Sequence, residues 1–388
     1  MPTASFARLV GSAVQRAALS KQSTWHTPFM AAATRAVAER VGMVDFVVEV
    51  RDARIPLSSE CEPLRCLSSS SRGIVLMNKA DLANRSLLET GTTLPQEWRQ
   101  HFERDNCVAY AINSHNKDDI QEFLNFLQRQ VRELCKAEVE RHTVTMMLVG
   151  IPNVGKSALA NSLHLIGRIS AAEKGKLKHA VVSPLPGETK TISSLKIASQ
   201  PNIYVLDTPG ILPPQVIDIE ACAKLALTGA LSDCLAGEEE LAQYLLAILN
   251  SNFEDKKWKN LRNNLNRGST AVEQQGHLLH SESVTKGKRQ YPTDHTQDFI
   301  VYDVRRRLSE TISSFQGNLE DVSVMERLIN VQFSSLREAF GLHISSQEDG
   351  NRKVAAKLLN LYRSGRLGHY TLDPLPSKYN SLKVRSYQ

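Results

Sequence analysis

The fold of this chain is decided by one short stretch, Gly150-Ile151-Pro152-Asn153-Val154-Gly155-Lys156-Ser157. Glycines at this spacing let backbone amides curl around a polyphosphate, while the lysine reaches the outer phosphates and the serine hydroxyl can ligate Mg²⁺. An apolar, β-prone run at 143–149 precedes the stretch and a helix-like run at 158–164 follows it. A strand that leads into a helix N-terminus is the setting in which anions bind. The sequence therefore predicts a phosphate loop, rather than a chance glycine turn, whose nucleotide-binding residues are Asn153, Val154, Gly155, Lys156, Ser157 and Ala158.

A second strand-like run, residues 202–206, ends in Asp207-Thr208-Pro209-Gly210. In this arrangement Asp207 is expected to hold Mg²⁺ through water, and the amide of Gly210 is expected to sense a γ-phosphate and order a switch segment.

The loop at 186–191, between these two motifs, contains threonines that could complete the Mg²⁺ shell. Thr189 is the preferred candidate and Thr191 the second, although threonine-rich loops are often only solvated turns. The predicted Mg²⁺ ligands are then Ser157, Thr189 and Asp207. The predicted catalytic residues are Lys156, Thr189 and Gly210.

The residues expected to read a base lie upstream of the phosphate loop. Asn78, Lys79 and Asp81 follow the strand-like run 73–77, at the carboxyl end where open α/β sheets bind ligands. The Asp81 carboxylate can accept hydrogen bonds from the ring N–H and the exocyclic amine of guanine, and adenine offers no such pair. Asn78 is expected to tie this loop to the phosphate loop, and the stem of Lys79 to lie on the base. After the next strand, Ser114 is expected to approach the guanine oxygen. An ordinary turn at 78–81 is the alternative, as is an ATPase, which Asp81 disfavours.

The order of these motifs is unusual, because GTPases normally present the phosphate loop before the guanine motif. Domain termini often lie close together, so a chain can be rejoined and reopened elsewhere without losing its fold. We therefore expect a circularly permuted P-loop GTPase, an α/β protein with a doubly wound, mostly parallel sheet. After Leu212 the pattern changes to helical spacing, which predicts an all-α C-terminal domain into which the switch segment leads directly.

Three further stretches resemble one known family. Asp52-Ala53-Arg54-Ile55-Pro56 after a strand-like run, together with 222–230 and 365–368, is similar to the circularly permuted GTPases of ribosome assembly, in particular the mitochondrial GTPase 1 branch. The resemblance covers about residues 25–372. It implies a factor that binds GTP and GDP, hydrolyses GTP, and docks on the mitochondrial large ribosomal subunit and its rRNA late in maturation.

The chain departs from that family where hydrolysis is concerned. The family's Trp-Phe-Pro-Gly-His-Met-Ala corresponds to Trp25-His26-Thr27-Pro28-Phe29-Met30-Ala31, so Phe29 replaces the histidine thought to position the attacking water. His26 lies too early to be carried over unless it swings in, and Ile211 replaces the glutamine of other GTPases, as it does throughout this family. Two hypotheses follow. Hydrolysis is weak until a ribosomal surface completes the site, or the protein is a GTP-dependent RNA-binding checkpoint factor with negligible hydrolysis.

Asn153 has two interpretations. In some GTPases that resemble this chain, an asparagine at this place helps to bind K⁺, which supplies positive charge beside the phosphates. Alternatively, Asn153 only shapes the turn.

The N-terminus lacks acidic residues before Glu39, and its apolar residues fall on one helical face: Phe6, Leu9, Val10, Ala13, Val14 and Ala17. This pattern predicts an import presequence at 1–24, with folded sequence beginning near Trp25; an amphipathic tail without that role is the alternative. We expect a mitochondrial protein, in the matrix or peripheral to the inner membrane, with the plastid as the lesser alternative.

The length of 388 residues allows two domains, expected at 25–213 and 214–375, with a flexible polar insertion at 251–296 and a basic tail at 376–388. No apolar run approaches the roughly 18–20 residues that span a bilayer. The net charge of +6 is clustered, and the clusters are either rRNA contacts or solvated surface: 256–267, 286–289, 305–307 and 378–385. The six cysteines show no metal-like spacing.

Overall fold

The structure is a computed structural model that describes residues 5–20, 28–62, 73–84, 95–137, 143–170, 180, 182, 189, 192–213, 218–233, 237–251, 295–342 and 347–376. The chain forms two compact units. One unit consists of residues 14–236 and 368–388 and is called here the sheet unit; the other consists of residues 1–13 and 237–367 and is called the helical unit.

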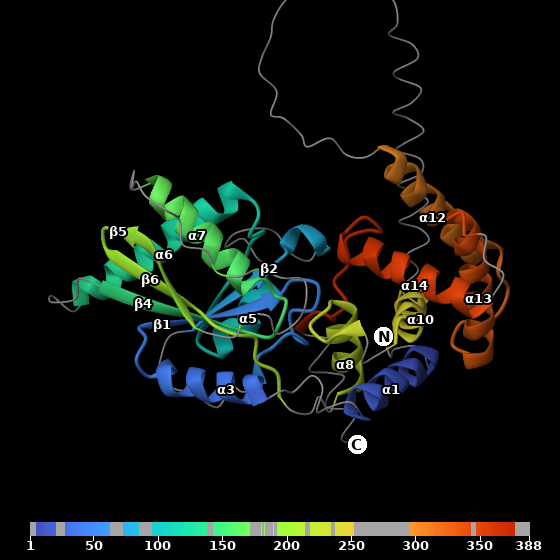
Figure 1. The fold of residues 1–388 in the computed structure, drawn as a ribbon, viewed down its shortest axis with the longest axis horizontal. Coiled ribbons are helices and arrows are strands. Elements are labelled where there is room, and N and C mark those ends of the chain that lie inside the picture. The colour runs from blue at the N-terminus through green and yellow to red at the C-terminus, as the bar shows by residue number, and fades with distance from the viewer. Residues whose placement is uncertain are drawn as a thin grey trace, which may run out of the picture. The chain divides into compact units, whose positions relative to one another are not determined.

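The sheet unit is built on a sheet of six strands in the order β3-β2-β1-β4-β6-β5 (Figure 1). The strands are β1 (Phe46–Asp52), β2 (Gly73–Asn78), β3 (Cys107–Ala111), β4 (Thr143–Val149), β5 (Ser193–Ser199) and β6 (Asn202–Asp207). All neighbours are parallel except β5, which pairs antiparallel with β6 at one edge. The predicted fold class, a mostly parallel sheet in permuted order, is confirmed. The edge strand β5 is an addition to the predicted strands.

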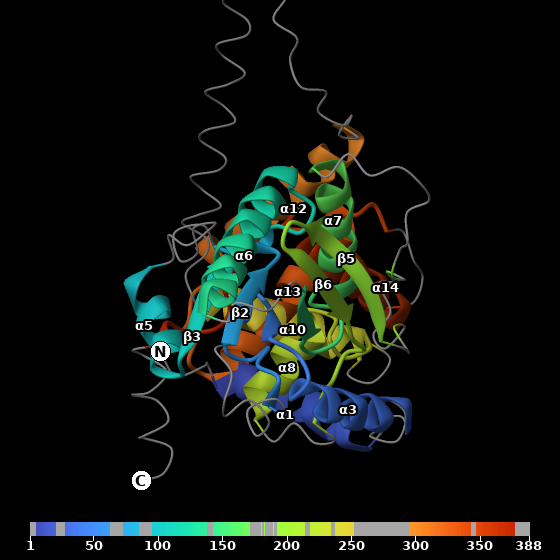
Figure 2. The same cartoon turned by 90° about the vertical axis from the view of Figure 1, so that its left-hand side faces the viewer.

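Helices cover both faces of this sheet (Figures 1 and 2). The helices α6 (Lys117–Ala137) and α7 (Lys156–Ser170) pack together on one face, and α3 (Pro28–Val41) lies against the other. The helix α5 (Gln96–Arg104) lies on the same face as α3. It packs on Val75 and Met77 of β2, and the strand register places these side chains on the same side of the sheet as Val47, which packs with α3. The central strands β1 and β2 are therefore buried on both sides. β2 reads as a nearly continuous apolar run for this reason, whereas β1 also carries buried charged residues.

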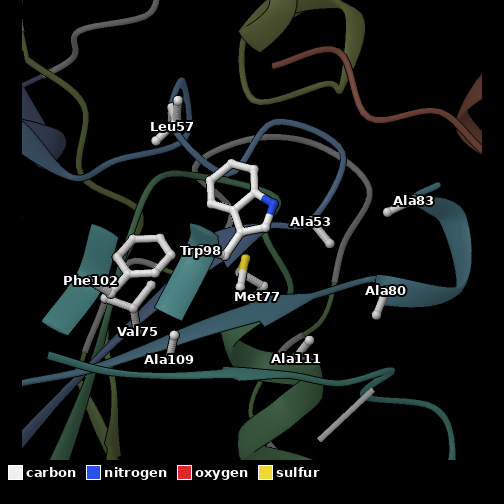
Figure 3. Close-up of a cluster of buried hydrophobic side chains, with 10 residues drawn as sticks. All are labelled: Ala53, Leu57, Val75, Met77, Ala80, Ala83, Trp98, Phe102, Ala109 and Ala111. Atoms are coloured by element: carbon white, nitrogen blue, oxygen red, sulfur yellow. The ribbon is translucent and has the colours of Figure 1, made fainter. Parts of the chain in front are cut away.

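The face under α5 carries a compact apolar cluster centred on Trp98 (Figure 3). Trp98 and Phe102 project from successive turns of α5 and stack with ring centroids 6.1 Å apart. Below Trp98 lie Met77 and the small side chains of β3, Ala109 and Ala111. The large rings of Trp98 and Phe102 fill the space above the small side chains of β3 and pack against β2. β2 ends at Asn78, the first of the predicted base-reading residues.

Parallel strands present their carboxyl ends at one edge of the sheet, and that edge collects the motifs. Asp52 ends β1, Asn78 ends β2, Gly150 follows β4 and Asp207 ends β6. Because β1 lies between β2 and β4, the Asp-Ala-Arg motif is placed between the base motif and the phosphate loop.

The helical unit contains, within 237–367, α10 (Glu238–Ser251), α12 (His295–Ser314), α13 (Val322–Ala339) and α14 (Gln347–Arg363). The helical spacing predicted after Leu212 is therefore confirmed in this part of the chain. A buried amide pair joins two of them: Asn250 and Gln332 exchange hydrogen bonds of 3.0 and 2.9 Å. In α12 the basic cluster 305–307, predicted to be an rRNA contact or solvated surface, has partners within the helical unit. Arg305 donates to the carbonyls of Arg366 and Leu367, while Arg306 and Arg307 pair with Asp303.

The two units divide the chain differently from the predicted boundary at 213/214. Helix α8 (Ile219–Leu227), whose side chains from Cys222 to Leu227 are buried, belongs to the sheet unit. The segment from Gly368 also returns to the sheet unit, since backbone and side-chain hydrogen bonds tie it to residues near β1 and β2. In the sequence, residues 237–367 of the helical unit are thus inserted between two parts of the sheet unit. The predicted insertion and basic tail lie almost wholly outside the described residues, as do the basic clusters at 256–267, 286–289 and 378–385.

The expectation that folded sequence begins near Trp25 is wrong. Residues 5–20 form α1 (Ser5–Ser20), a helix in which Phe6, Val10 and Val14 are buried. Its buried face differs from the one predicted, because Leu9 is 58% exposed. The assignment of 1–24 as an import signal is a separate matter and stays a prediction.

None of the helices in the described part of the chain is both long and apolar enough to cross a membrane.

Candidate nucleotide-binding site

The phosphate loop joins β4 to α7 and is shaped by unusual backbone conformations. Asn153 has φ 60°, in the left-handed region that asparagine tolerates, and Gly155 has φ 95°, a conformation that glycine adopts most readily. A Cβ at Gly155 would lie 2.3 Å from Asn78 Nδ2, so the loop also needs glycine for close approach to the base motif. Lys156 begins α7 and donates from Nζ to the carbonyls of Gly150 at 3.0 Å and Ile151 at 2.8 Å.

Burial dominates the electrostatics of Lys156. It lowers the lysine pKa to about 8, although the Asp207 carboxylate acts in the opposite direction. A buried cation with few charged partners is a favourable receptor for phosphate oxygens, because their binding supplies the missing negative charge.

The three predicted Mg²⁺ ligands meet in space. Ser157 Oγ donates to Asp207 Oδ2 at 2.7 Å, and Ser157 Oγ lies 3.2 Å from Thr189 Oγ1. Thr189 is thereby placed beside the other two, whereas the competing candidate Thr191 lies outside the described residues. Ser157 comes from the start of α7, Thr189 from the segment before β5, and Asp207 from the end of β6.

Asp207 has the environment expected of a metal-ligating carboxylate. It is fully buried, and among the described residues its Oδ1 has no hydrogen-bond partner. Burial raises the Asp207 pKa, against the opposing effects of the Ser157 hydrogen bond and the Lys156 charge. An orphaned oxygen on a carboxylate, beside two hydroxyl groups, forms an all-oxygen donor set that fits Mg²⁺.

The Asp-Thr-Pro-Gly segment is held against the phosphate loop by its backbone. Thr208 Oγ1 donates to the carbonyl of Leu148 at 2.6 Å, and Ile211 N donates to the carbonyl of Gly150 at 3.1 Å. A Cβ on Gly210 would come within 2.6 Å of Pro152 Cα. The close approach at Gly210 therefore excludes any larger residue and brings this segment beside the phosphate loop.

The base motif is connected to the phosphate loop by two side chains. Asn78 is buried; it donates from Nδ2 to the carbonyl of Val154 at 2.8 Å and accepts from Ser114 N at 3.0 Å. Lys79, with φ 61°, donates from Nζ to the carbonyl of Asn153 at 2.5 Å. Asp81 lies one position beyond the buried Ala80 and is exposed. Asn78 therefore has the bridging position expected for it, and Asp81 is accessible to a ligand.

Asp52 of the Asp-Ala-Arg motif contacts this site and Arg54 binds Asp52, roles that the sequence patterns did not assign. Asp52 accepts from Lys79 Nζ at 2.9 Å, and Arg54 binds the same carboxylate through two guanidinium nitrogens. The only advance signal was a charged Asp-x-Arg directly after a buried strand.

The two positions linked to water activation are occupied by apolar side chains. Phe29 stands in the first turn of α3 and is 68% exposed, and Ile211 is buried against α3. His26 lies outside the described residues.

Comparison with known proteins gives a consistent result. The family described as "50S ribosome-binding GTPase" matches residues 145–277. The chain is 56% identical to "DAR GTPase 2, mitochondrial" of Arabidopsis thaliana, over 95% of this chain and 94% of that protein. It is 40% identical to "Short integuments 2, mitochondrial" of the same plant, over 91% and 89%. It is also 33% identical to "Ribosome biogenesis GTPase A" of Bacillus licheniformis, over 60% of this chain and 76% of that protein.

Proposed function

The chain belongs to the family of circularly permuted GTPases represented by these relatives, and on that premise we propose that it assists assembly of the mitochondrial large ribosomal subunit. In this proposal the protein binds GTP, contacts the rRNA of the maturing subunit, and leaves after hydrolysis to GDP. The name of the bacterial relative supports a role in ribosome assembly, and the family description points to the large subunit. The names of the two plant relatives support a mitochondrial location, with the matrix as the compartment that contains the ribosomes.

The observation that carries the nucleotide part is the meeting of base motif, phosphate loop and metal-ligand set at one sheet edge. Asn78 and Lys79 join the loop that would read guanine to the loop that would hold the phosphates. Lys156 would exchange the carbonyls of Gly150 and Ile151 for phosphate oxygens. Mg²⁺, which GTPases require, would be held by Ser157, Thr189 and Asp207 and would neutralise charge on the phosphates during hydrolysis.

Asn153 is proposed to contribute to a K⁺ site. Its side-chain amide donates from Nδ2 to the carbonyl of Gly229 at 2.8 Å, which fixes the orientation of the amide plane. A fixed amide oxygen in the phosphate loop is a suitable ligand for a monovalent cation, and the cation would supply charge where other GTPases use an arginine.

Slow intrinsic hydrolysis is also part of the proposal. Phe29 and Ile211 offer no group that could orient a water molecule, so the ribosomal surface would have to complete the site. The second candidate is a GTP-gated RNA-binding factor with negligible turnover. It rests on the same two apolar side chains, but in this case the ribosome does not raise the rate of GTP hydrolysis.

The decisive measurement is GTP hydrolysis by the full chain in K⁺ and in Na⁺ buffer, with and without mitochondrial large subunits. Turnover that rises with K⁺ and with subunits supports the assembly GTPase. Tight GTP binding without turnover in any condition favours the gated binding factor. Failure to bind subunits in either nucleotide state would reject both.

The assignment of guanine as the base has its own test. Asp81→Asn should weaken GTP binding and improve xanthosine triphosphate binding, because the amide donates where the carboxylate accepted. Asp105→Asn is a suitable control, since Asp105 is an exposed carboxylate at the end of α5 with no part in the proposed site. Equal loss of both nucleotides in Asp81→Asn would contradict the guanine assignment.

A further inference from the structure

The carboxylate of Asp52 is the centre of a buried charge cluster beside the base motif. Its Oδ1 accepts from Arg54 N at 3.0 Å and Arg54 Nε at 2.9 Å. Its Oδ2 accepts from Arg54 Nη2 at 2.7 Å and Lys79 Nζ at 2.9 Å. Asp52 and Arg54 are each only 2% exposed. One buried carboxylate therefore pairs with two cations.

The two cations lead from Asp52 in different directions. Lys79 reaches the carbonyl of Asn153 in the phosphate loop, while Arg54 Nη2 reaches the carbonyl of Thr228 at 3.4 Å, just after α8. Asn153 Nδ2 binds the next carbonyl, that of Gly229. The C-terminal turn of α8 thus faces a cation and an amide donor, and the partial negative charge at a helix C-terminus favours both.

Electrostatics explains why the aspartate is needed there. Burial lowers the Lys79 pKa, and the nearby Arg54 charge lowers it as well, whereas the Asp52 carboxylate raises it. Burial would raise the Asp52 pKa, but the charges and hydrogen bonds of Arg54 and Lys79 lower it overall. Without the carboxylate, two cations would face each other in a low-dielectric site, and Lys79 would turn away from the phosphate loop.

A purely structural ion pair is the simpler alternative, and β1 contains one for comparison. Glu49 and Arg51 also form a buried acid-x-arginine pair on this strand, at 2.8 Å. The two side chains also contact Cys61 N, the Pro56 carbonyl and Glu60, none of which belongs to the nucleotide loops. The Asp52 pair differs because its carboxylate also binds a lysine of the base motif.

We infer that Asp52 is a positioning residue for guanine-nucleotide binding that acts through Lys79, and that Arg54 joins the same carboxylate to the turn after α8. The inference rests on the proposed guanine site. It gives each charged residue of the Asp-Ala-Arg motif a defined role. The aspartate orients the base-motif lysine, and the arginine connects this arrangement to the segment that leads into the helical unit.

The test is a double-mutant cycle on GDP affinity, measured with a fluorescent GDP analogue on the full chain. Asp52→Asn and Lys79→Met should each raise Kd on the order of tenfold, and the double variant should bind no worse than Lys79→Met alone, because coupled residues act as one unit. Effects that multiply in the double variant, or an unchanged Kd in Asp52→Asn, would overturn the inference.

Glu49→Gln is the matched control, because it also breaks a buried ion pair on β1. It should lower the thermal midpoint as Asp52→Asn does, yet leave the Kd for GDP within about twofold of the wild type. An equal loss of affinity in Glu49→Gln would assign the Asp52 effect to general destabilisation.

Asp52→Asn leaves Arg54 buried without its anion, so a folded alternative is needed. The double variant Asp52→Asn with Arg54→Met removes both buried charges, and Lys79 still loses its ion pair with Asp52. If this folded variant binds GDP as tightly as the wild type, the inference is wrong. If the wild type itself binds no guanine nucleotide, the proposed function fails instead.

Discussion

Lys224 Nζ lies 3.1 Å from Asp373 Oδ1, although the two residues are 149 positions apart in the chain. Their side chains are only 7% and 2% exposed. The same carboxylate accepts from the backbone N–H groups of Leu57 and Ser58, both at 2.8 Å. One aspartate after the helical unit therefore fastens the C-terminal segment, α8 and the loop after β1 into a single arrangement within the sheet unit.

Replacing Asp373 should strongly destabilise the folded protein. Asp373→Asn leaves Lys224 without its closest anion and weakens two backbone hydrogen bonds, so we expect a loss of about 3 kcal/mol in unfolding free energy, measured by urea denaturation. The exposed pair between Arg352 and Glu238, 3.7 Å apart, is the control. Arg352→Ala should cost less than about 1 kcal/mol. Equal losses would show that Asp373 is not an anchor.

The same pair has a defined pH dependence. Burial lowers the pKa of Lys224, but the charges of Asp373 and Glu220 raise it overall above 10.5. A raised lysine pKa stabilises the fold fully below the unfolded value, and that stability is lost as pH rises through the folded value. The stability gap between wild type and Lys224→Met should thus be constant from neutral pH to about pH 9 and shrink only under more alkaline conditions. A gap that shrinks near neutral pH would contradict this.

The helix α1 offers a test of whether the N-terminus belongs to the folded protein. Val14 on this helix is fully buried. Val14→Asp should therefore lower the unfolding free energy by about 3 kcal/mol, the cost of placing a carboxylate in an apolar site. Leu9→Asp makes the same chemical change on the exposed side and should have little effect. If both variants melt like the wild type, α1 does not pack as described.

The cysteine in α8 reports on whether that helix is in place. Burial, with a smaller effect of Asp218, raises the pKa of Cys222 to about 11. At pH 8 roughly one thiol in a thousand is then ionised, and alkylation should be very slow. The half-buried Cys107 should react before Cys222, as followed by peptide mass spectrometry. Denatured protein should label both at similar rates; similar rates in the native protein would show that α8 is not docked.

The buried amide pair of the helical unit should behave asymmetrically. Asn250→Leu leaves the Gln332 amide unsatisfied and should cost about 2 kcal/mol in unfolding free energy. Asn250→Leu with Gln332→Leu removes both polar groups and should recover most of that loss. A double variant that loses more than the single one would argue for a packing role, since leucine differs from both amides in shape.

Much of the sheet unit was predictable because its chemistry is local. The phosphate loop and the Asp-x-x-Gly motif each occupy a few consecutive residues, and both follow strands. Ser157 and Asp207 meet because β4 and β6 are parallel and their carboxyl ends share an edge. Thr189 joins them because β5, which follows it, is antiparallel and begins at that same edge. The assignment of these side chains to metal and nucleotide remains a prediction.

The features that could not be predicted are contacts between residues far apart in sequence. Nothing near Asp373 indicates that its partners are Lys224 and the loop after β1, because no periodic pattern relates them. The partners of Arg305, Arg306 and Arg307 are another example, because the sequence shows the charges but not the acids and carbonyls that they bind. The buried face of α1 was also predicted wrongly, since Leu9 was assigned to it and is exposed. A helix with small residues on several sides has no single apolar stripe from which to predict the buried face.

The return of the chain to the sheet unit after residue 367 changes how deletions must be designed. A stop codon placed after Ala236 would remove residues 237–367 of the helical unit, but it would also discard Asp373 and leave Lys224 without that anion. Loss of nucleotide binding in such a truncated protein would say nothing about the helices themselves. An internal excision of residues 237–367 that rejoins the flanking segments would keep this anchor, and it is the appropriate reagent for asking what the helices contribute.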